Sequence, residues 1–171
     1  AARRHYPDPA YAELRRRLAD GHGVAPHRVL LAASGSEWIL RFSAWCARRG
    51  YGPLWWPVPG YGDYAHAARV WGLAHASGPA LACAGWLCDP GSPLGQPEDA
   101  AAAQALLAAG APVTLDLAYA PLRLQGEPAL TERQRARCWQ LYSPNKALGL
   151  TGVRAAYVIA PEDAGPGEQI G

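Results

Sequence analysis

The chain has 171 residues, 50% of them hydrophobic and 18% charged, and its formal net charge at neutral pH is +2. This length is sufficient for one substantial core, so the composition predicts a globular domain. So small a net charge points to no nucleic-acid or other acidic partner. Because no run of about 18 apolar residues occurs, no membrane span is expected.

Apolar periodicity and turn residues divide the chain into alternating helices and strands. In order, we expect a helix at 9–20, a strand at 28–32, a helix at 36–49, a strand at 53–57, a helix at 61–71, a strand at 80–88, a helix at 97–109, and strands at 112–117, 137–142 and 154–159. This alternation predicts an α/β fold with three layers, α/β/α, around a mostly parallel sheet.

Local signals add detail to three of these helices. The first is expected to end at Gly21, and the helix at 97–109 is expected to have Pro97 in its first turn and Gly110 as its stop. The helix at 36–49 is expected to bury one side, formed by Trp38, Ile39, Phe42 and Trp45.

The four cysteines, at 46, 83, 88 and 138, form no C-x-x-C pair, and no histidine cluster accompanies them. A metal site is therefore not expected. Because all four lie in apolar stretches, we expect buried, reduced thiols, which fit a cytoplasmic protein.

Polar residues follow three of the predicted strands, at 34–36, 89–92 and 116–119. In open α/β sheets, ligands bind beyond the carboxyl ends of the strands. We therefore expect these segments to contribute to one shared site.

Lys146 is the only lysine among 16 basic residues. An arginine stays protonated, whereas a desolvated lysine can lose its proton and attack a carbonyl group as a nucleophile. Ser143 and Arg154 flank it, so this stretch suits an aldehyde that also bears a phosphate. The alternative from this residue alone is an ordinary solvent-exposed lysine.

The pattern S-x-x-K followed by G-L-x-G-x-R, from Ser143 to Arg154, resembles the cofactor-lysine motif of fold-type I pyridoxal-phosphate enzymes. It is similar to aminotransferase class I/II, near histidinol-phosphate aminotransferase and the threonine-phosphate decarboxylase of the cobalamin pathway. The resemblance extends from Tyr6 to Arg154. It implies pyridoxal 5'-phosphate as cofactor and an amino acid or phosphorylated amino acid as substrate.

The resemblance also implies the catalytic roles. Lys146 would hold the cofactor through a Schiff base, Asp116 would keep the pyridine nitrogen protonated, and Tyr119 would donate to the phenolic oxygen. Taken without the resemblance, Asp116 could simply cap a turn at a strand end, and Tyr119 could be a core tyrosine with its hydroxyl at the surface.

Other matched positions imply cofactor-binding roles. Gly35 and Ser36 at a helix start, together with Ser143 and Arg154, would bind the phosphate. Tyr61 would stack on the ring, with Tyr64 as second choice. Tyr6 matches a tyrosine that reaches the phosphate of a neighbouring subunit, which implies a homodimer. These expected residues are Tyr6, Gly35, Ser36, Tyr61, Ser92, Asp116, Tyr119, Ser143, Lys146 and Arg154.

The segment D-P-G-S-P-L-G, at 89–95, departs from the family's N-P-N-N-P-T-G loop. Ser92 takes the place of the asparagine that binds the phenolic oxygen, and its hydroxyl reaches less far than an amide. Asp89 replaces the first asparagine of the same loop. Leu117 also replaces a glutamate in the D-E-A-Y motif, at a position that does not usually contact the cofactor.

Three functions remain open from the sequence. Amino-group transfer is the default, a decarboxylase of threonine-phosphate type is the second, and a degenerate or truncated non-catalytic relative is the third. We expect residues 1–160 to form part of a cofactor-binding large domain and 161–171 to form a loop or tail. The family's C-terminal small domain is expected to be absent from this chain.

Overall fold

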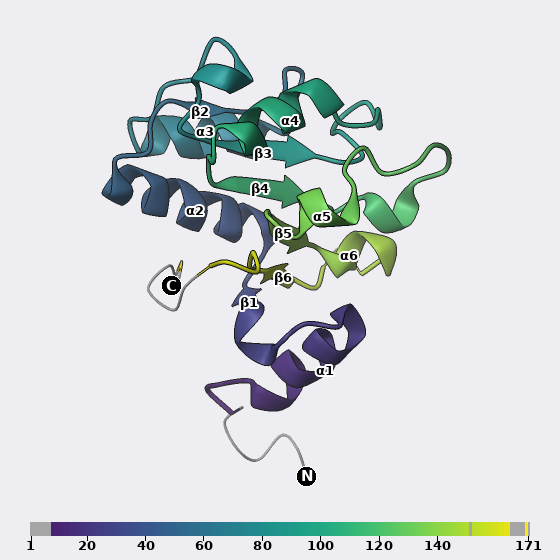
Figure 1. Cartoon of the computed structure of the whole chain (residues 1–171). Coiled ribbons are helices and arrows are strands. Elements are labelled where there is room, and N and C mark those ends of the chain that lie inside the picture. The colour runs from purple at the N-terminus through teal and green to yellow at the C-terminus, as the bar shows by residue number, and fades with distance from the viewer. Residues whose placement is uncertain (1–7, 151, 165–169, 171) are drawn as a thin grey trace.

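The computed structural model of the chain describes residues 8–150, 152–164 and 170, and it contains one six-stranded sheet (Figure 1). Across the sheet, the strands lie in the order β1-β6-β5-β4-β3-β2. Their bounds are β1 Val29–Ala32, β2 Leu54–Trp55, β3 Ala84–Cys88, β4 Val113–Asp116, β5 Trp139–Tyr142 and β6 Ala156–Ile159. Strands β2 to β5 are parallel to one another, and β6 is antiparallel to both β5 and β1. The predicted mostly parallel sheet is therefore confirmed.

Helices cover both faces of this sheet, which gives the predicted three layers (Figure 1). Residues of α2 and α3 pack against one face, and residues of α4 pack against the other. Helix α1 packs beside β1 and β6. The helix bounds are α1 Ala12–His22, α2 Gly35–Arg49, α3 Gly62–Val70, α4 Ala100–Ala108, α5 Glu132–Arg135 and α6 Pro144–Ala147. The two short helices, α5 and α6, were not predicted.

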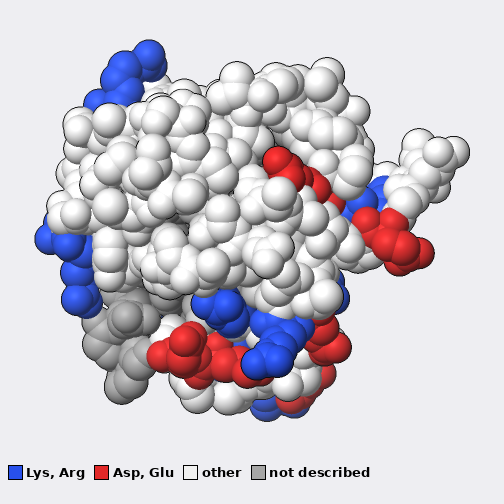
Figure 2. All heavy atoms as spheres, turned by 45° about the horizontal axis from the view of Figure 1, so that its top comes forward, with Lys and Arg blue, Asp and Glu red and all other residues white. Residues whose placement is uncertain are grey.

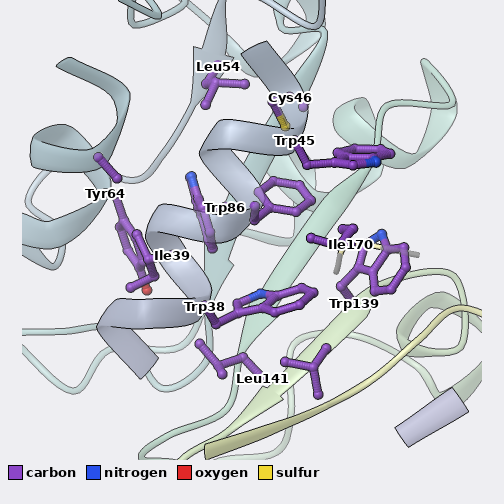
Figure 3. Packing of buried hydrophobic residues seen from close by; sticks show 14 of the residues in the cluster. Trp38, Ile39, Trp45, Cys46, Leu54, Tyr64, Trp86, Trp139, Leu141 and Ile170 are labelled. Carbon is purple, nitrogen blue, oxygen red and sulfur yellow. The ribbon is translucent and has the colours of Figure 1, made fainter. Parts of the chain in front are cut away.

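An aromatic core fixes α2 against the sheet (Figure 3). The predicted buried side of this helix is confirmed, since Trp38, Ile39, Phe42 and Trp45 are all buried. Phe42 meets Trp86 of β3 with ring centroids 4.8 Å apart, and Trp38 meets Trp139 of β5 at 5.8 Å. Large aromatic side chains bury much apolar area, so this cluster fixes where the helix begins relative to the strand ends.

Some predicted boundaries were wrong, and hydrogen bonding explains why. Helix α1 continues through Gly21 and ends at His22. Gly23 caps it, because its φ of 64° lies in the left-handed region that suits a glycine cap. Helix α4 begins after Pro97, because the Asp99 side chain accepts from the N–H groups of the first turn. Strand β3 begins at Ala84 because a short 3-10 helix, Pro79–Leu81, precedes it.

The cysteine prediction holds for three residues and fails for one. Cys46, Cys88 and Cys138 are buried free thiols, whereas Cys83 is exposed because it lies in the loop before β3. Burial raises the pKa of the Cys88 thiol to about 12. Within the described ranges, no group of three or more histidine, cysteine, aspartate or glutamate residues is arranged to bind a metal, and no helix is long and apolar enough to cross a membrane.

Figure 2 shows that charged side chains lie mainly near the rim of one face, while its centre is mostly uncharged. That view brings forward the part of the molecule around β2, α3 and α4 in Figure 1. Large hydrophobic side chains exposed on these elements and their loops include Val58, Val70, Trp71 and Leu81. The surface distribution agrees with a low charged content.

The end of α1 gives a first prediction. Replacement of Gly23 by Ala should lower the free energy of unfolding by about 1–2 kcal/mol, because an L side chain is strained in the left-handed region. Replacement of Gly21 by Ala should instead raise it by about 0.5–1 kcal/mol, because a Cβ there meets nothing within 4 Å and alanine favours the helix interior. Urea unfolding of both variants checks the pair. If both variants changed the free energy of unfolding in the same direction and by the same amount, a helix end at Gly23 would be contradicted.

Candidate functional site

A cavity of ≈240 Å³ lies at the carboxyl ends of β1, β4 and β5. It brings together eight of the residues singled out from the sequence: Gly35, Ser36, Tyr61, Asp116, Tyr119, Ser143, Lys146 and Arg154.

The sheet topology explains why residues far apart in the chain meet here. Strands β4 and β5 are parallel, so Asp116 and Ser143, which end and follow them, reach the same edge. Strand β1 runs in the same direction and leads into α2. Because β6 is antiparallel, its beginning lies at this edge, which brings in Arg154 just before it.

Asp116 lies at the end of β4 and is only 6% exposed. Its Oδ1 accepts a hydrogen bond from the N–H of Ala118 at 2.9 Å, and its Oδ2 accepts one from the hydroxyl of Tyr64 at 2.8 Å. Burial raises the pKa of this carboxyl, while the two donors and the charge of Lys146 act in the opposite direction. The carboxylate is thus held in one orientation beside the cavity.

Tyr64 has a role that the sequence did not reveal. It is fully buried on α3, where its ring stacks on Trp86 with centroids 5.1 Å apart and planes 12° apart. Burial, and then the charge of Asp116, raise its pKa well above the usual value, so the hydroxyl stays protonated and donates to Asp116. Tyr64 therefore supports the aspartate instead of lining the cavity. The feature of the sequence that could have indicated this role is the helical spacing between Tyr61 and Tyr64.

Lys146 and Tyr119 both line the cavity and contact one another. Lys146 belongs to the short helix α6, and its Nζ lies 5.3 Å from the ring centroid of Tyr119. Tyr119, directly after β4, is 39% exposed. A cation over an aromatic face is a favourable electrostatic contact. It holds the amine on the same side of the cavity as the end of β4.

The beginning of α2 also lines the cavity. The Ser34 hydroxyl caps the N–H of Glu37 at 3.1 Å, so the N–H groups of Gly35 and Ser36 stay available in the first turn. These donors and the positive end of a helix dipole favour an anion. Arg154 also lines the cavity and adds a formal positive charge there.

Ser143 and Asn145, which precede Lys146 in the chain, form a buried pair. The Ser143 hydroxyl donates to Asn145 Oδ1 at 2.7 Å, and both side chains line the cavity. To bind a phosphate oxygen, the Ser143 hydroxyl has to rotate away from Asn145, since only its hydrogen is a donor. The sequence reasoning missed Asn145, although its place directly before the only lysine was visible.

One expected residue lies elsewhere. Ser92 lines an adjacent cavity of ≈610 Å³, and Tyr119 is a wall of both cavities. Tyr61 does line the Lys146 cavity, and it is 40% exposed. Tyr6 lies outside the described residues. The strand-end segments therefore contribute to two neighbouring cavities instead of one shared site.

The chain resembles enzymes of known activity in sequence. It is 27% identical to histidinol-phosphate aminotransferase 2 of Burkholderia mallei and to histidinol-phosphate aminotransferase 1 of Burkholderia pseudomallei, in each case over 92% of this chain and 48% of the relative. The chain thus spans about half the length of the curated relatives it matches. No family model matches the chain.

Solved structures share its fold. A threonine-O-3-phosphate decarboxylase from Porphyromonas gingivalis superposes with a TM-score of 0.76 at 23% identity, over 94% of this chain and 55% of that one. A histidinol-phosphate aminotransferase from Sinorhizobium meliloti, solved in complex with pyridoxal-5'-phosphate, gives 0.70 at 19% identity, over 96% and 49%. The predicted resemblance to fold-type I pyridoxal-phosphate enzymes is confirmed.

A second prediction concerns the support of Asp116. Its folded-state pKa is raised, so this carboxyl contributes most stability when protonated, and the contribution declines as pH rises through the folded pKa. Tyr64→Phe removes a donor to the ionised form, which raises the pKa of Asp116 further. The variant should lose about 1–3 kcal/mol of unfolding free energy at neutral pH and less in acid.

Urea unfolding as a function of pH checks this, with Tyr142→Phe as the matched control. The Tyr142 hydroxyl donates to the neutral Gln140 amide oxygen at 3.1 Å, so its loss should not vary with pH in the same range. A Tyr64→Phe effect that stayed constant from acid to neutral pH would mean that the tyrosine does not stabilise the carboxylate.

Proposed function

From the fold of fold-type I pyridoxal-phosphate enzymes and a sequence similar to histidinol-phosphate aminotransferases, we propose that the chain binds pyridoxal 5'-phosphate beside Lys146 and transfers the amino group of an amino acid. The observation that carries the proposal is the cavity itself. It places the only lysine, a buried carboxylate and a helix N-terminus with an arginine around one small space.

The donor set of the cavity fits this cofactor. Asp116 is a buried carboxylate that takes hydrogen bonds only from neutral donors among the described residues, so a protonated pyridine nitrogen suits it as a charged partner. Gly35, Ser36 and Arg154, which line the same cavity, suit a phosphate. Lys146 also lines it and offers a primary amine for the aldehyde.

The bound cofactor would supply an electron sink for the substrate carbon. Asp116 would hold the proton on the ring nitrogen, and Tyr64 would keep that carboxylate oriented. Lys146, once displaced by the substrate amine, would accept and return a proton as base and acid. Tyr119 would donate to the phenolic oxygen, and Tyr61 would cover the ring.

Decarboxylation of a phosphorylated amino acid is the second candidate. The similarity to the Porphyromonas gingivalis threonine-O-3-phosphate decarboxylase favours it. The two reactions differ in the substrate bond that breaks, so mass analysis of products from amino acids and phosphorylated amino acids separates them. A non-catalytic relative is the third candidate, favoured by Asp89 and Ser92 in place of asparagines, and it would bind the cofactor without turnover.

We also propose that the active form is a cytoplasmic homodimer with sites at the subunit interface. The support for this arrangement is the match of Tyr6 to a residue that reaches a neighbouring phosphate. Sedimentation of the protein with and without cofactor tests the assembly.

The third prediction tests the amine. Lys146→Ala should abolish the absorbance band near about 420 nm that develops when pyridoxal phosphate is added, together with all turnover, because no other lysine can substitute. Lys146→Arg is the matched variant, since it keeps the positive charge but is not an amine nucleophile. Both should fold as the parent does in urea unfolding. A parent-like band or parent-like turnover in either variant would refute the assignment.

The fourth prediction tests the phosphate end. Arg154→Ala should weaken binding of pyridoxal phosphate by about 1.5–3 kcal/mol, which is one to two decades of affinity, and should leave binding of phosphate-free pyridoxal nearly unchanged. Titration of both compounds measures this difference. Arg28→Ala is the control, because its side chain bonds to Ala160 at the far end of β6. Equal weakening for both compounds would mean that Arg154 acts through the fold.

A further inference from the structure

A buried ion pair lies outside the Lys146 cavity and has no part in the proposed chemistry. Arg123 Nη2 lies 2.7 Å from Asp89 Oδ1, and the two side chains are only 14% and 3% exposed. Asp89 follows β3, and Arg123 follows the 3-10 helix η3 (Ala120–Leu122) after β4. The pair therefore ties together the loops that leave two neighbouring strands.

Asp89 has further partners that extend this connection. Its Oδ2 accepts from the N–H of Ala129 at 2.9 Å, and its Oδ1 accepts from the N–H of Glu98 at 3.4 Å. One carboxylate thus joins three segments: the loop before α4, the turn that holds Arg123 and the loop before α5. Arg123 also reaches the carbonyl of Glu127 at 3.4 Å, within the same turn region.

The loops joined by this pair hold the two residues expected at the phenolic edge of the cofactor. Ser92 lies in the segment that starts at Asp89, and Tyr119 precedes η3, four residues before Arg123. Both side chains, and Arg123 itself, line the ≈610 Å³ cavity. Tyr119 also lines the Lys146 cavity. A shift of either loop therefore changes the wall between the two cavities.

Stability alone gives a weak reason for such a pair. Desolvation of two charges offsets most of their attraction, so apolar residues of similar volume often stabilise a protein as well or better. What an ion pair adds over an apolar contact is direction, because a guanidinium and a carboxylate meet in few geometries.

We propose that Asp89 and Arg123 are positioning residues for the proposed cofactor site, which hold the Tyr119 turn against the Ser92 loop at the phenolic edge. The aspartate at 89, a departure from the family's asparagine, then gives Arg123 a charged partner, which an asparagine would not. This inference rests on the proposed function. It gives the loop at 89–95, whose sequence departs from the family's motif, a role in an intact site instead of a degenerate one.

The test uses the double variant Asp89→Asn/Arg123→Met, because removal of both charges leaves no unpaired buried charge, and Arg123→Met alone as a second variant. The probes are pyridoxal phosphate and its analogue that lacks the phenolic hydroxyl group. The double variant should bind pyridoxal phosphate about fivefold to tenfold more weakly than the parent, as for loss of one hydrogen bond, and should bind the analogue unchanged. Arg123→Lys, which keeps the charge, should retain part of the affinity for pyridoxal phosphate that the double variant loses.

Arg28→Met is the matched control, since the Arg28 side chain is 15% exposed and lies away from both cavities. It should alter stability without altering the affinity ratio for the two probes. If the double variant had the same ratio of affinities for the two probes as the parent, whether or not both affinities were weaker, the positioning role would be overturned. If the parent bound neither probe, the proposed function would fail instead, so the two failures are distinguishable.

Discussion

The burial of one carboxylate at the end of β4 is the constraint on which the site depends. An isolated Asp116 would be costly to remove from water, and its place at the carboxyl edge of a parallel sheet leaves few donors within reach. The fold supplies two, the N–H of Ala118 and the hydroxyl of Tyr64. Tyr64 is fixed in turn by its stacking on Trp86, inside the aromatic core beneath α2 and α3. The orientation of the carboxylate is therefore a property of the core as much as of the loop.

The same sheet determines what faces this carboxylate. Parallel β4 and β5 bring Asp116 and the segment of Lys146 to one edge, and antiparallel β6 adds Arg154. The aromatic contacts of α2 fix its first turn at this edge, where unpaired N–H groups favour an anion. Groups of opposite charge therefore line one small cavity, which suits a ligand that carries both a cationic ring nitrogen and a phosphate.

The loops after β3 and β4 form a second layer around this arrangement. An ion pair joins them, Asp89 with Arg123, and Arg123 lines the neighbouring cavity that shares Tyr119 with the Lys146 cavity. Sequence comparison with the family loop marks Asp89 only as a departure, because the matching arginine is 34 positions later in the numbering and belongs to no motif. Its pairing depends on adjacent strands in the sheet. Tyr64 is a similar case, since its partner lies 52 residues away.

The sequence by itself determined the layer architecture and the buried side of α2, because apolar periodicity and turn residues are local features of the chain. The residues around Lys146 were expected from the resemblance of short motifs to those of fold-type I pyridoxal-phosphate enzymes. The sequence also predicted most element positions, but it misplaced the end of α1 and the start of α4, where a glycine φ and an aspartate cap decided the boundary. Only the tertiary structure decided that Ser92 lies in a different cavity from Lys146, that Ser143 donates to Asn145, and that Tyr64 supports Asp116. These facts depend on which strands are neighbours and how α3 packs on β3, and such long-range contacts leave no periodic signal in the chain.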